Sequence, residues 1–329
     1  MRRVLVTPPN VDEQTLAFLG AHDCEIVQPQ KAEAQLSDEE LRALVAEVDG
    51  WIIGPAAHVT RALIEAAPRC KFFTRRGVGY ERLDIDAIAR NGRVAAIATG
   101  GNDASVADAA IGLMLGVGRR MREQQQAMLQ GDWSIRVSTD LCQKTVGIIG
   151  MGRSGRAVVQ RLKGFEARIL SVTPRPDADF AKREGVTFTD LATLLRESDY
   201  VSIHAPLTPK TRHLIGKAEL TLMKQSAILI NTARGGLVDD AALLQALQQG
   251  VIAGAGLDVY EGESDAALKP IAQALIALPQ VVATPHSAAS TREGLKRTNA
   301  IAARIIVALF DNVSPPPDCI IADGRTPIA

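Results

Sequence analysis

The stretch that decides the fold is Thr145-Val-Gly-Ile-Ile-Gly150-Met-Gly152-Arg-Ser-Gly155-Arg-Ala-Val-Val-Gln-Arg-Leu162. It reads as a buried strand, a glycine turn and a helix, and a second apolar run follows directly. A GxGxxG pattern is weak evidence alone, but in this strand–turn–helix–strand context it predicts a dinucleotide-binding turn. Gly150 would permit the tight turn, Gly152 would let backbone approach a pyrophosphate, and Gly155 would let the helix pack on the strand. The helix N-terminus would attract the phosphates.

The end of the second strand bears on the choice of cofactor. NAD sites usually place an acidic residue there, about 20 residues after the glycine turn, to bind the ribose hydroxyls. This chain has Val172-Thr173-Pro-Arg175-Pro instead. Because arginine can hold a 2′-phosphate through a bidentate contact, we expect NADP rather than NAD. Asp177, two residues further on, keeps NAD open as an alternative.

Outside this motif, short apolar runs alternate with helix-period segments. The runs are continuous, which is typical of strands buried on both faces of a parallel sheet, so we expect doubly wound α/β units. The expected strands are residues 4–7, 51–53, 72–74, 94–97, 146–149, 169–172, 200–203, 228–231 and 281–284, and the shorter expected helices are 38–48, 153–163, 191–197 and 240–248.

Two longer helices are also expected, and a chain of 329 residues suggests about two domains. Residues 104–126 predict one long helix whose first half is so apolar that it must be buried between domains or between subunits. Residues 291–310 predict another, ended by the prolines at 315–317. About a hundred residues with their own strand–helix pattern precede the dinucleotide motif.

Composition narrows the class of protein further. The 37 basic residues balance the 37 acidic residues, so nothing indicates a nucleic-acid or anionic-membrane partner. The four cysteines lie far apart without a CxxC pair, so we expect no metal site, no disulfide framework and a reducing cytoplasm. No apolar run reaches the ~18 residues of a membrane span, and the N-terminal run is too short for a signal peptide.

In the second half of the chain, polar side chains follow three expected strands. Arg234 follows the run at 228–231, Asp258 and Glu263 follow a run at 254–257, and His286 follows the run at 281–284. Ligands of open α/β sheets bind at these carboxyl ends. A histidine proton donor, a cation for the carboxylate and an acid that tunes the histidine are what hydride transfer to a 2-oxo acid requires. Each residue taken alone could be structural.

The spacing of these four residues resembles that of the D-isomer-specific 2-hydroxyacid dehydrogenases. This family includes phosphoglycerate dehydrogenases, glyoxylate and hydroxypyruvate reductases and phosphite dehydrogenase. The resemblance extends over nearly the whole chain, through Arg75-Arg-Gly77-Val78-Gly79-Tyr-Glu-Arg-Leu-Asp84, Asn102-Asp-Ala-Ser-Val-Ala-Asp108, the GxGxxG turn and His204-Ala-Pro206-Leu-Thr.

The resemblance implies a role for each site residue. His286 would be the general acid of reduction, Glu263 would orient its ring and keep it protonated, and Arg234 would bind the carbonyl and carboxylate oxygens. Asp258 would contact the nicotinamide carboxamide. The expected substrate contacts are Val78 and Gly79, through backbone N–H groups, together with Arg234 and His286. The expected cofactor contacts are Gly150, Gly152, Arg153, Ser154, Gly155, Thr173, Arg175, His204, Pro206, Thr232, Ala233 and Asp258.

The resemblance also implies the domain plan. A Rossmann dinucleotide-binding domain of residues 100–289 would be inserted in a flavodoxin-like substrate domain formed by residues 1–99 and 290–329. The protein would be a homodimer that pairs through residues 104–126. The expected activity is that of a glyoxylate or hydroxypyruvate reductase. A short 3-phosphoglycerate dehydrogenase, a phosphite dehydrogenase and a nucleotide-sensing scaffold like the related corepressors are the alternatives.

Three departures from the family pattern bear on these expectations. Ser264 follows Glu263 where proline is usual, and Asp108 stands where glutamate is common. The loop of residues 54–58 lacks the arginine that phosphoglycerate dehydrogenases tend to place there for the substrate phosphate. The last departure argues against 3-phosphoglycerate as the substrate.

Overall fold

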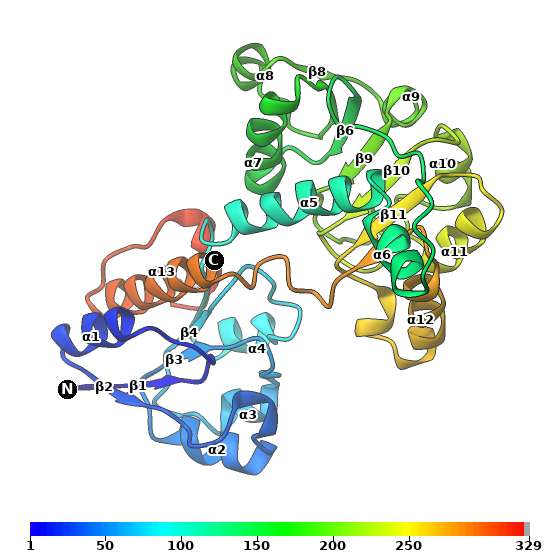
Figure 1. The fold of residues 1–329 in the computed structure, drawn as a ribbon. Helices are drawn as coiled ribbons and strands as arrows, with labels where there is room; N and C mark the ends of the chain where they lie inside the picture. Colours follow the sequence, from blue (N-terminus) through cyan, green and yellow to red (C-terminus); the bar gives the residue numbers. More distant parts are fainter. Residues whose placement is uncertain (326–329) are drawn as a thin grey trace. The chain divides into compact units, whose positions relative to one another are not determined.

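The structure is a computed structural model that describes residues 1–325. They form two compact units: unit 1 comprises residues 1–102 and the chain from Thr291 on, and unit 2 comprises Asp103–Ser290. Both units are α/β, with helices on either side of a sheet (Figure 1). Within the described residues, no helix combines the length and the apolar character needed to cross a bilayer.

Unit 2 is built on a seven-stranded sheet in which every neighbouring pair is parallel. The strand order is β12-β11-β10-β9-β6-β7-β8, so the order reverses between β6 and β9. In an open α/β sheet, the crevice at such a reversal is the usual ligand site. The strands are β6 (Thr145–Ile149), β7 (Arg168–Val172), β8 (Val186–Phe188), β9 (Tyr200–Ile203), β10 (Ile228–Asn231), β11 (Gly254–Leu257) and β12 (Val281–Ala283).

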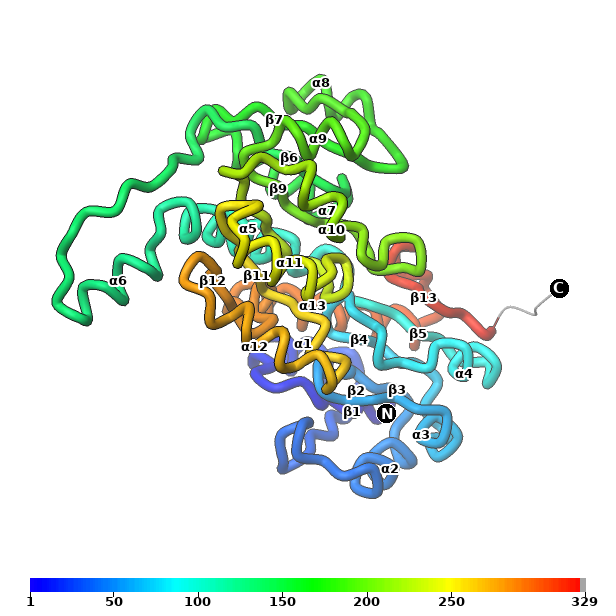
Figure 2. Tube along the Cα trace, turned by 90° about the vertical axis from the view of Figure 1, so that its right-hand side faces the viewer, coloured from blue at the N-terminus to red at the C-terminus, as the bar shows by residue number. Residues whose placement is uncertain are grey.

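Helices cover both faces of this sheet, each over its own apolar core. One face carries α5 (Asp103–Gly118), α7 (Arg153–Leu162) and α8 (Ala178–Glu184). The other carries α9 (Leu191–Glu197), α10 (Lys217–Leu222), α11 (Asp240–Gln248) and α12 (Lys269–Ala277). Helix α6 (Met121–Leu129) and the segment after it extend away from the sheet (Figure 2). The short 3-10 helices of this unit are η2 (Lys163–Phe165), η3 (Glu261–Glu263) and η4 (Ala266–Leu268).

Unit 1 is built on a six-stranded sheet of order β13-β5-β4-β3-β1-β2, parallel except for β13, which is antiparallel to β5. The strands are β1 (Arg2–Val6), β2 (Cys24–Val27), β3 (Gly50–Ile53), β4 (Phe72–Arg75), β5 (Val94–Ile97) and β13 (Ile320–Asp323). Helices α1 (Glu13–Ala21) and α13 (Arg292–Phe310) cover one face; α2 (Asp38–Ala46), α3 (Arg61–Glu65) and α4 (Ile85–Arg90) cover the other (Figure 1). The 3-10 helices are η1 (Glu33–Gln35) and η5 (Pro317–Cys319).

A buried carboxylate fills the crevice where the strand order of unit 1 reverses, between β1 and β3. Glu33 is 6% exposed and accepts hydrogen bonds from Thr7 Oγ1 (2.5 Å), Gly54 N (2.7 Å) and Ala56 N (2.7 Å). A Cβ atom on Gly54 would lie 2.4 Å from Glu33 Oε2, so a side chain at position 54 would have to displace the Glu33 carboxylate from its hydrogen bonds. The loop after β3 is therefore held by the side chain that occupies this crevice.

Most predicted elements are confirmed, and the predicted fold class of two doubly wound sheets is confirmed. The prediction of one helix over residues 104–126 is wrong. Helix α5 ends at Gly118, where a Cβ would lie 2.3 Å from the Tyr200 hydroxyl, and α6 begins after Arg120, whose φ of 50° is left-handed. A left-handed residue interrupts the helical hydrogen bonds, so the chain changes direction there.

Candidate active site

The glycine turn lies where β6 meets α7, at the strand-order reversal of unit 2. Gly150 has a φ of 97°, and a Cβ on it would lie 2.7 Å from the His204 backbone at the end of β9. A Cβ on Gly155 would lie 2.2 Å from Gly150 O, so the helix packs directly on the turn. Gly152 is the residue at the N-terminal end of α7, where no side chain hydrogen-bonds to the first helix amides, and the space beside it is open. Uncapped helix amides beside open space fit a pyrophosphate.

The loop after β7 carries the residues that would meet the ribose. Arg175 is exposed, and among residues 1–325 it forms no ion pair. Asp177 accepts from Phe180 N (2.9 Å) as the cap of α8 and pairs with Arg156 of α7 (2.8 Å). The backbone hydrogen bond from Phe180 and the Arg156 contact lower the pKa of Asp177. Both carboxylate oxygens of Asp177 are thus already engaged. Thr173, in the same loop, is half-buried.

Other expected cofactor residues follow β9 and β10. Burial lowers the pKa of His204 to about 4, so its ring is neutral, and its Nε2 lies 2.9 Å from Ser202 Oγ. Pro206 is exposed two residues later. Thr232 is 6% exposed, and its Oγ1 has no hydrogen-bond partner among the described residues. Ala233 donates its N–H to Asn231 Oδ1 (3.1 Å).

Asp258 organises the loop that carries the candidate histidine. It is 1% exposed and accepts hydrogen bonds from Thr284 Oγ1 (2.5 Å), Ser287 N (2.8 Å) and Ala288 N (3.0 Å). The backbone N–H of His286 donates to the backbone carbonyl of Asp258 (2.8 Å). These contacts hold His286 at a φ of 53°, a left-handed backbone that non-glycine residues rarely adopt. Sequence analysis missed this organising role, although the polar residues flanking His286 are a signal for it.

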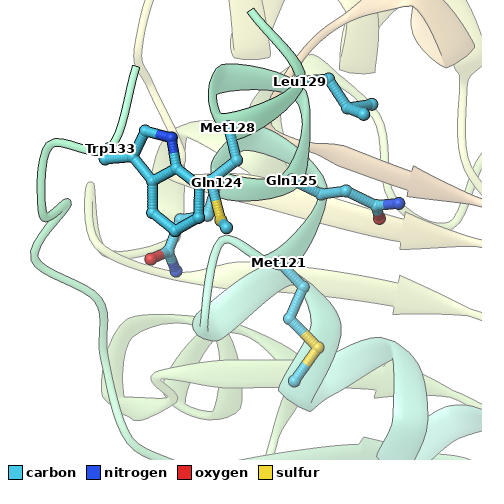
Figure 3. A pocket seen from close by; sticks show the side chains of 6 residues that line it. All are labelled: Met121, Gln124, Gln125, Met128, Leu129 and Trp133. Atoms are coloured by element: carbon cyan, nitrogen blue, oxygen red, sulfur yellow. The ribbon is translucent and has the colours of Figure 1, made fainter. Parts of the chain in front are cut away.

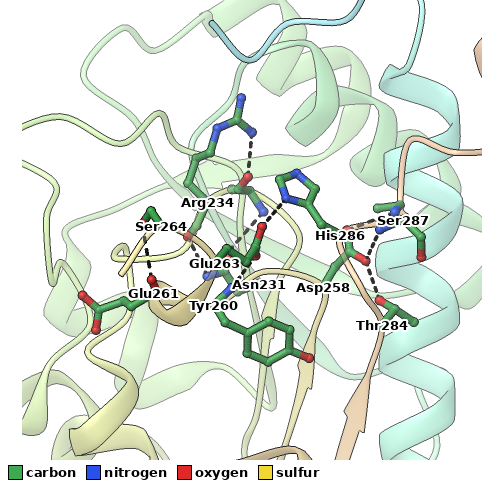
Figure 4. Close-up of polar contacts among 12 residues, drawn as sticks. Asn231, Arg234, Asp258, Tyr260, Glu261, Glu263, Ser264, Thr284, His286 and Ser287 are labelled. Carbon is green, nitrogen blue, oxygen red and sulfur yellow. Dashed lines mark hydrogen bonds and ion pairs between the residues drawn. The ribbon is translucent and has the colours of Figure 1, made fainter. Parts of the chain in front are cut away.

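His286 and Glu263 form the central pair of the site. His286 Nδ1 lies 2.6 Å from Glu263 Oε2, and Glu263 Oε1 accepts from Tyr260 N (2.7 Å) (Figure 4). Because Nδ1 faces a carboxylate, we assign it the proton. The hydrogen bond that Glu263 accepts from the His286 ring raises the pKa of His286, against the effects of desolvation and of the Arg234 charge. The side chain is 51% exposed, and no described residue hydrogen-bonds to its Nε2. A proton on Nε2 is therefore accessible to a ligand.

Arg234 completes this group within unit 2 (Figure 4). It is half-buried, donates from Nη1 to Ala233 O (2.7 Å), and its charge acts on the His286 ring. Asn231 at the end of β10 fixes the turn by donating to Arg234 O (3.0 Å). An imidazole, a carboxylate and a guanidinium from three strand ends are thus brought together. This arrangement can protonate a carbonyl oxygen while it binds a carboxylate.

The remaining candidates lie elsewhere. Val78 and Gly79 belong to unit 1, in the loop after β4, where Arg75 Nε donates to Gly79 O (2.9 Å). Asp108 is on α5 and pairs with Arg161 of α7. Ser264 donates from Oγ to Glu261 O (3.3 Å), a local contact that proline could not make.

Comparison with known proteins gives consistent matches. Residues 111–288, more than half of the chain, match the family described as "D-isomer specific 2-hydroxyacid dehydrogenase, NAD binding domain". A D-3-phosphoglycerate dehydrogenase of Methanocaldococcus jannaschii is 36% identical over 309 residues, 93% of this chain but 57% of that relative. The chain thus spans only somewhat more than half the length of that relative. A hydroxypyruvate reductase of Thermotoga maritima is 35% identical and is covered more fully, with 90% of this chain and 94% of the relative.

Solved structures agree on the fold. The structure of D-lactate dehydrogenase with NAD⁺ from Lactobacillus jensenii superposes with a TM-score of 0.83 at 28% identity, over 98% of this chain and 100% of that chain. The fold of this chain is therefore shared with a solved D-lactate dehydrogenase. The chain belongs to the family of D-isomer-specific 2-hydroxyacid dehydrogenases.

Proposed function

We propose that this protein reduces small 2-oxo acids to D-2-hydroxy acids with a nicotinamide cofactor. The observation that carries the proposal is the 2.6 Å contact between His286 Nδ1 and Glu263, within reach of the Arg234 charge. Family members with the same domain include a hydroxypyruvate reductase. That name, together with a compact histidine–acid–arginine group, supports a 2-oxo acid as the substrate class.

When bound along the glycine turn, NADH or NADPH supplies the hydride. Arg234 binds the carboxylate and carbonyl oxygens of the 2-oxo acid and polarises the carbonyl. His286 donates the Nε2 proton to the carbonyl oxygen as it becomes a hydroxyl. Glu263 accepts a hydrogen bond from Nδ1–H, which fixes the orientation of the ring and stabilises its cationic form. In the oxidative direction His286 accepts the hydroxyl proton.

Further residues are proposed to contact the substrate or the cofactor. For Val78 and Gly79, the proposed contact is made by their backbone N–H groups, to the substrate carboxylate. Asp258 uses three of its lone pairs on the 284–288 loop, so one remains for the nicotinamide carboxamide. The buried, unpartnered Thr232 hydroxyl lies beside Ala233 in the turn that leads to Arg234, and we place it against the cofactor.

The substrate we favour has a small uncharged side chain, as in glyoxylate or hydroxypyruvate. Glu33 occupies the space at Gly54, and no cationic side chain stands at that position to bind a phosphate group. Glu33 also holds the amides of Gly54 and Ala56, which a phosphate could otherwise use. The M. jannaschii relative is named for 3-phosphoglycerate, and this is the alternative substrate to test.

For the cofactor we favour NADP over NAD. The acid that could bind ribose hydroxyls, Asp177, is engaged by Arg156 and by the α8 amide, whereas the exposed Arg175 forms no ion pair within residues 1–325. A free guanidinium beside an occupied acid favours a 2′-phosphate. The L. jensenii structure contains NAD⁺, so NAD is the alternative.

We propose a homodimer that pairs through α5, α6 and the segment after α6. Apolar side chains gather there in exposed positions, and Met121, Met128, Leu129 and Trp133 border a hollow on α6 (Figure 3). Ile135 and Val137, further along the segment, are 94% and 86% exposed. Such a patch on a segment that leaves its own sheet fits an interface between identical subunits (Figure 2).

For the compartment we favour the cytoplasm, because all four cysteines are free thiols.

The decisive experiment is a substrate panel with both cofactors. Oxidation of NADPH and NADH is followed by absorbance with glyoxylate, hydroxypyruvate, pyruvate and the 3-phosphorylated hydroxypyruvate. We expect turnover with glyoxylate or hydroxypyruvate above that with the phosphorylated acid. Folded protein that oxidises neither cofactor with any 2-oxo acid contradicts the proposal.

A further inference from the structure

A second cluster of charged side chains lies behind the candidate active site, and the proposed reaction does not use it. Its centre is Glu261, a carboxylate that is 7% exposed in η3, two residues before Glu263. Glu261 Oε1 accepts from Arg212 Nη2 (3.1 Å) and lies 2.8 Å from His213 Nε2. Both donors come from the loop between β9 and α10. Two hydrogen bonds to one oxygen of a buried carboxylate hold that side chain in place, unlike a solvated carboxylate on the surface.

The other oxygen of Glu261 joins the cluster to α11. Asp240 N donates to Glu261 Oε2 (3.3 Å), and Glu261 N donates to Asp240 Oδ2 (2.9 Å). Asp240 is 4% exposed, and burial, with a smaller contribution from the Glu261 charge, raises its pKa to about 6. The two acids therefore repel each other, and the Arg212 charge and the His213 hydrogen bond to Glu261 offset that repulsion. Removing either contact would leave a buried carboxylate pair undercompensated.

The cluster connects the two turns that carry the candidate catalytic groups. His213 N donates to Gly236 O (2.7 Å), and Ile215 pairs with Val238 in a parallel bridge, so the β9–α10 loop is tied to the turn after Arg234. A Cβ on Gly235 would lie 2.2 Å from Tyr260 O, so that turn packs on the backbone of the Glu263 turn. Figure 4 shows Glu261 and Glu263 on the same short turn beside Arg234.

We propose that Arg212, His213 and Asp240 act through Glu261 as positioning residues, which hold the Arg234 turn and the Glu263 turn in register. None of the three is assigned to substrate or cofactor contact. The inference rests on the proposed function for its kinetic consequence, but its physical consequence can be measured without turnover. If the Glu263 turn shifts, its 2.6 Å hydrogen bond to His286 lengthens.

The His286 ring reports this shift. The groups that act on its charge are Glu263, Asp258 and Arg234, and the Glu263 hydrogen bond is the largest influence on its pKa. Loosening that bond lowers the pKa of His286. A general loss of stability would leave the titration of the folded protein unchanged. The titration therefore separates a positioning role from a merely structural one.

The test compares three variants of the whole protein. His213→Asn suits the left-handed backbone at this position, where φ is 51°, but its side chain is too short to keep the contact with Glu261. Glu261→Gln keeps the shape and removes the charge. Asp199→Asn is the matched control: Asp199 is a half-buried acid of the same sheet that pairs with Lys224 (2.8 Å) and accepts from Thr145 N (2.9 Å), at the opposite ends of the strands.

The measurement is the pH titration of the His286 ring by NMR, with its signal identified by its loss in His286→Gln. We expect His286 to titrate at lower pH in His213→Asn and Glu261→Gln than in the wild type, and unchanged in Asp199→Asn. With an active wild type, KM for the 2-oxo acid should rise about ten-fold in His213→Asn, the change typical of one lost charge-assisted hydrogen bond, while KM for the cofactor stays within about two-fold.

The outcomes keep the two proposals distinguishable. An unchanged His286 titration in both variants, or an equal shift in Asp199→Asn, overturns the positioning role even if the enzyme reduces 2-oxo acids. A wild type without activity, but with the expected shift of the His286 titration, overturns the proposed function and leaves the positioning role standing. If Glu261→Gln does not fold, His213→Asn, whose side chain is 39% exposed in the wild type, decides the matter.

Discussion

Replacing Glu263 by glutamine tests the centre of the proposed mechanism. Glutamine can still accept the Tyr260 N–H through its amide oxygen, so the η3 turn keeps its cap. It then presents a neutral amide to His286 Nδ1 in place of a carboxylate at 2.6 Å. The substitution removes a charge while it conserves the local shape, so its effect reports on the His286–Glu263 pair.

The size of the effect follows from the exposure of this pair. A hydrogen bond to a charged group contributes about 1.5–3 kcal/mol when it is well shielded from water. The His286 and Glu263 side chains are 51% and 36% exposed, so solvent screening places this contact at the lower end of that range. A loss of about 1.5 kcal/mol in the transition state corresponds to about a ten-fold fall in kcat/KM for reduction.

The pH dependence gives the sharper result. Glu263 raises the pKa of His286, and reduction requires the protonated ring. In the wild type, kcat/KM for reduction is therefore high at low pH and falls as pH rises through the His286 pKa. In Glu263→Gln the fall should occur at lower pH, so the deficit is smallest in acid and largest in alkali. In the oxidative direction, which requires the neutral ring, the rise of activity with pH should also move to lower pH.

The assay is kcat/KM measured across this pH range with the best 2-oxo acid, in the wild type and in Glu263→Gln. A deficit of the same size at every pH, with the midpoint unmoved, refutes the role given to Glu263. Binding of the reduced cofactor, followed by fluorescence, should be unchanged. A loss of cofactor affinity equal to the loss of kcat/KM would place Glu263 in the cofactor site instead.

Four further outcomes are expected. His286→Ala should lower kcat at least about a hundred-fold, the usual size of a lost general acid, with the cofactor Kd retained in a fluorescence titration. Arg175→Ala should weaken NADPH about ten-fold and leave NADH nearly unchanged, measured by KM for each cofactor; equal effects would remove the phosphate role. The pKa of Asp240 is raised to about 6, so its contribution to stability is full below about 3.8 and is lost as pH rises through 6. Asp240→Asn lacks this titration, so the Tm of the variant minus the Tm of the wild type should increase by about 5 °C from acid to alkaline pH, measured by calorimetry. Ile135→Asp should shift the protein from dimer to monomer in sedimentation, and a wild type that sediments as a monomer would refute the interface.

The sequence predicted the parts of the fold that depend on local patterns. The glycine turn follows from its GxGxxG pattern, and α9 and α11 follow from apolar periodicity. In the structure, Asp190 and Asp239 also cap these two helices through hydrogen bonds three residues ahead. The break between α5 and α6 could not be predicted from local sequence, because it depends on a tertiary contact. The close approach of the Tyr200 hydroxyl to Gly118 joins residues far apart in the chain. The edge strands β2, β8 and β13 were missed because they are short and partly exposed, so they lack a continuous apolar run.

For the candidate site, residue types and spacing identified Arg234, Glu263 and His286, and the structure brings these three side chains together. The same reasoning gave no role to the charged cluster around Glu261, whose contacts join three separate segments through Arg212, His213 and Asp240. It also assigned Asp258 to the cofactor alone and missed its bonds to the Ser287 and Ala288 amides. Hydrogen bonds between a side chain and a distant backbone leave no periodic trace in a sequence.

The sheets of both units reverse their strand order, but only in unit 1 does a side chain of the chain itself, Glu33, occupy the reversal point. In unit 2 the reversal point is lined by glycines and open to a diphosphate, whereas in unit 1 the chain has placed its own anion where a bound anion would sit. The Glu33 carboxylate is part of the chain, so it competes with any phosphate for the Gly54 and Ala56 amides at high effective concentration, and its charge repels the phosphate as well. With unit 2 as the proposed nucleotide-binding unit, we therefore expect the strand reversal of unit 1 to bind no second nucleotide.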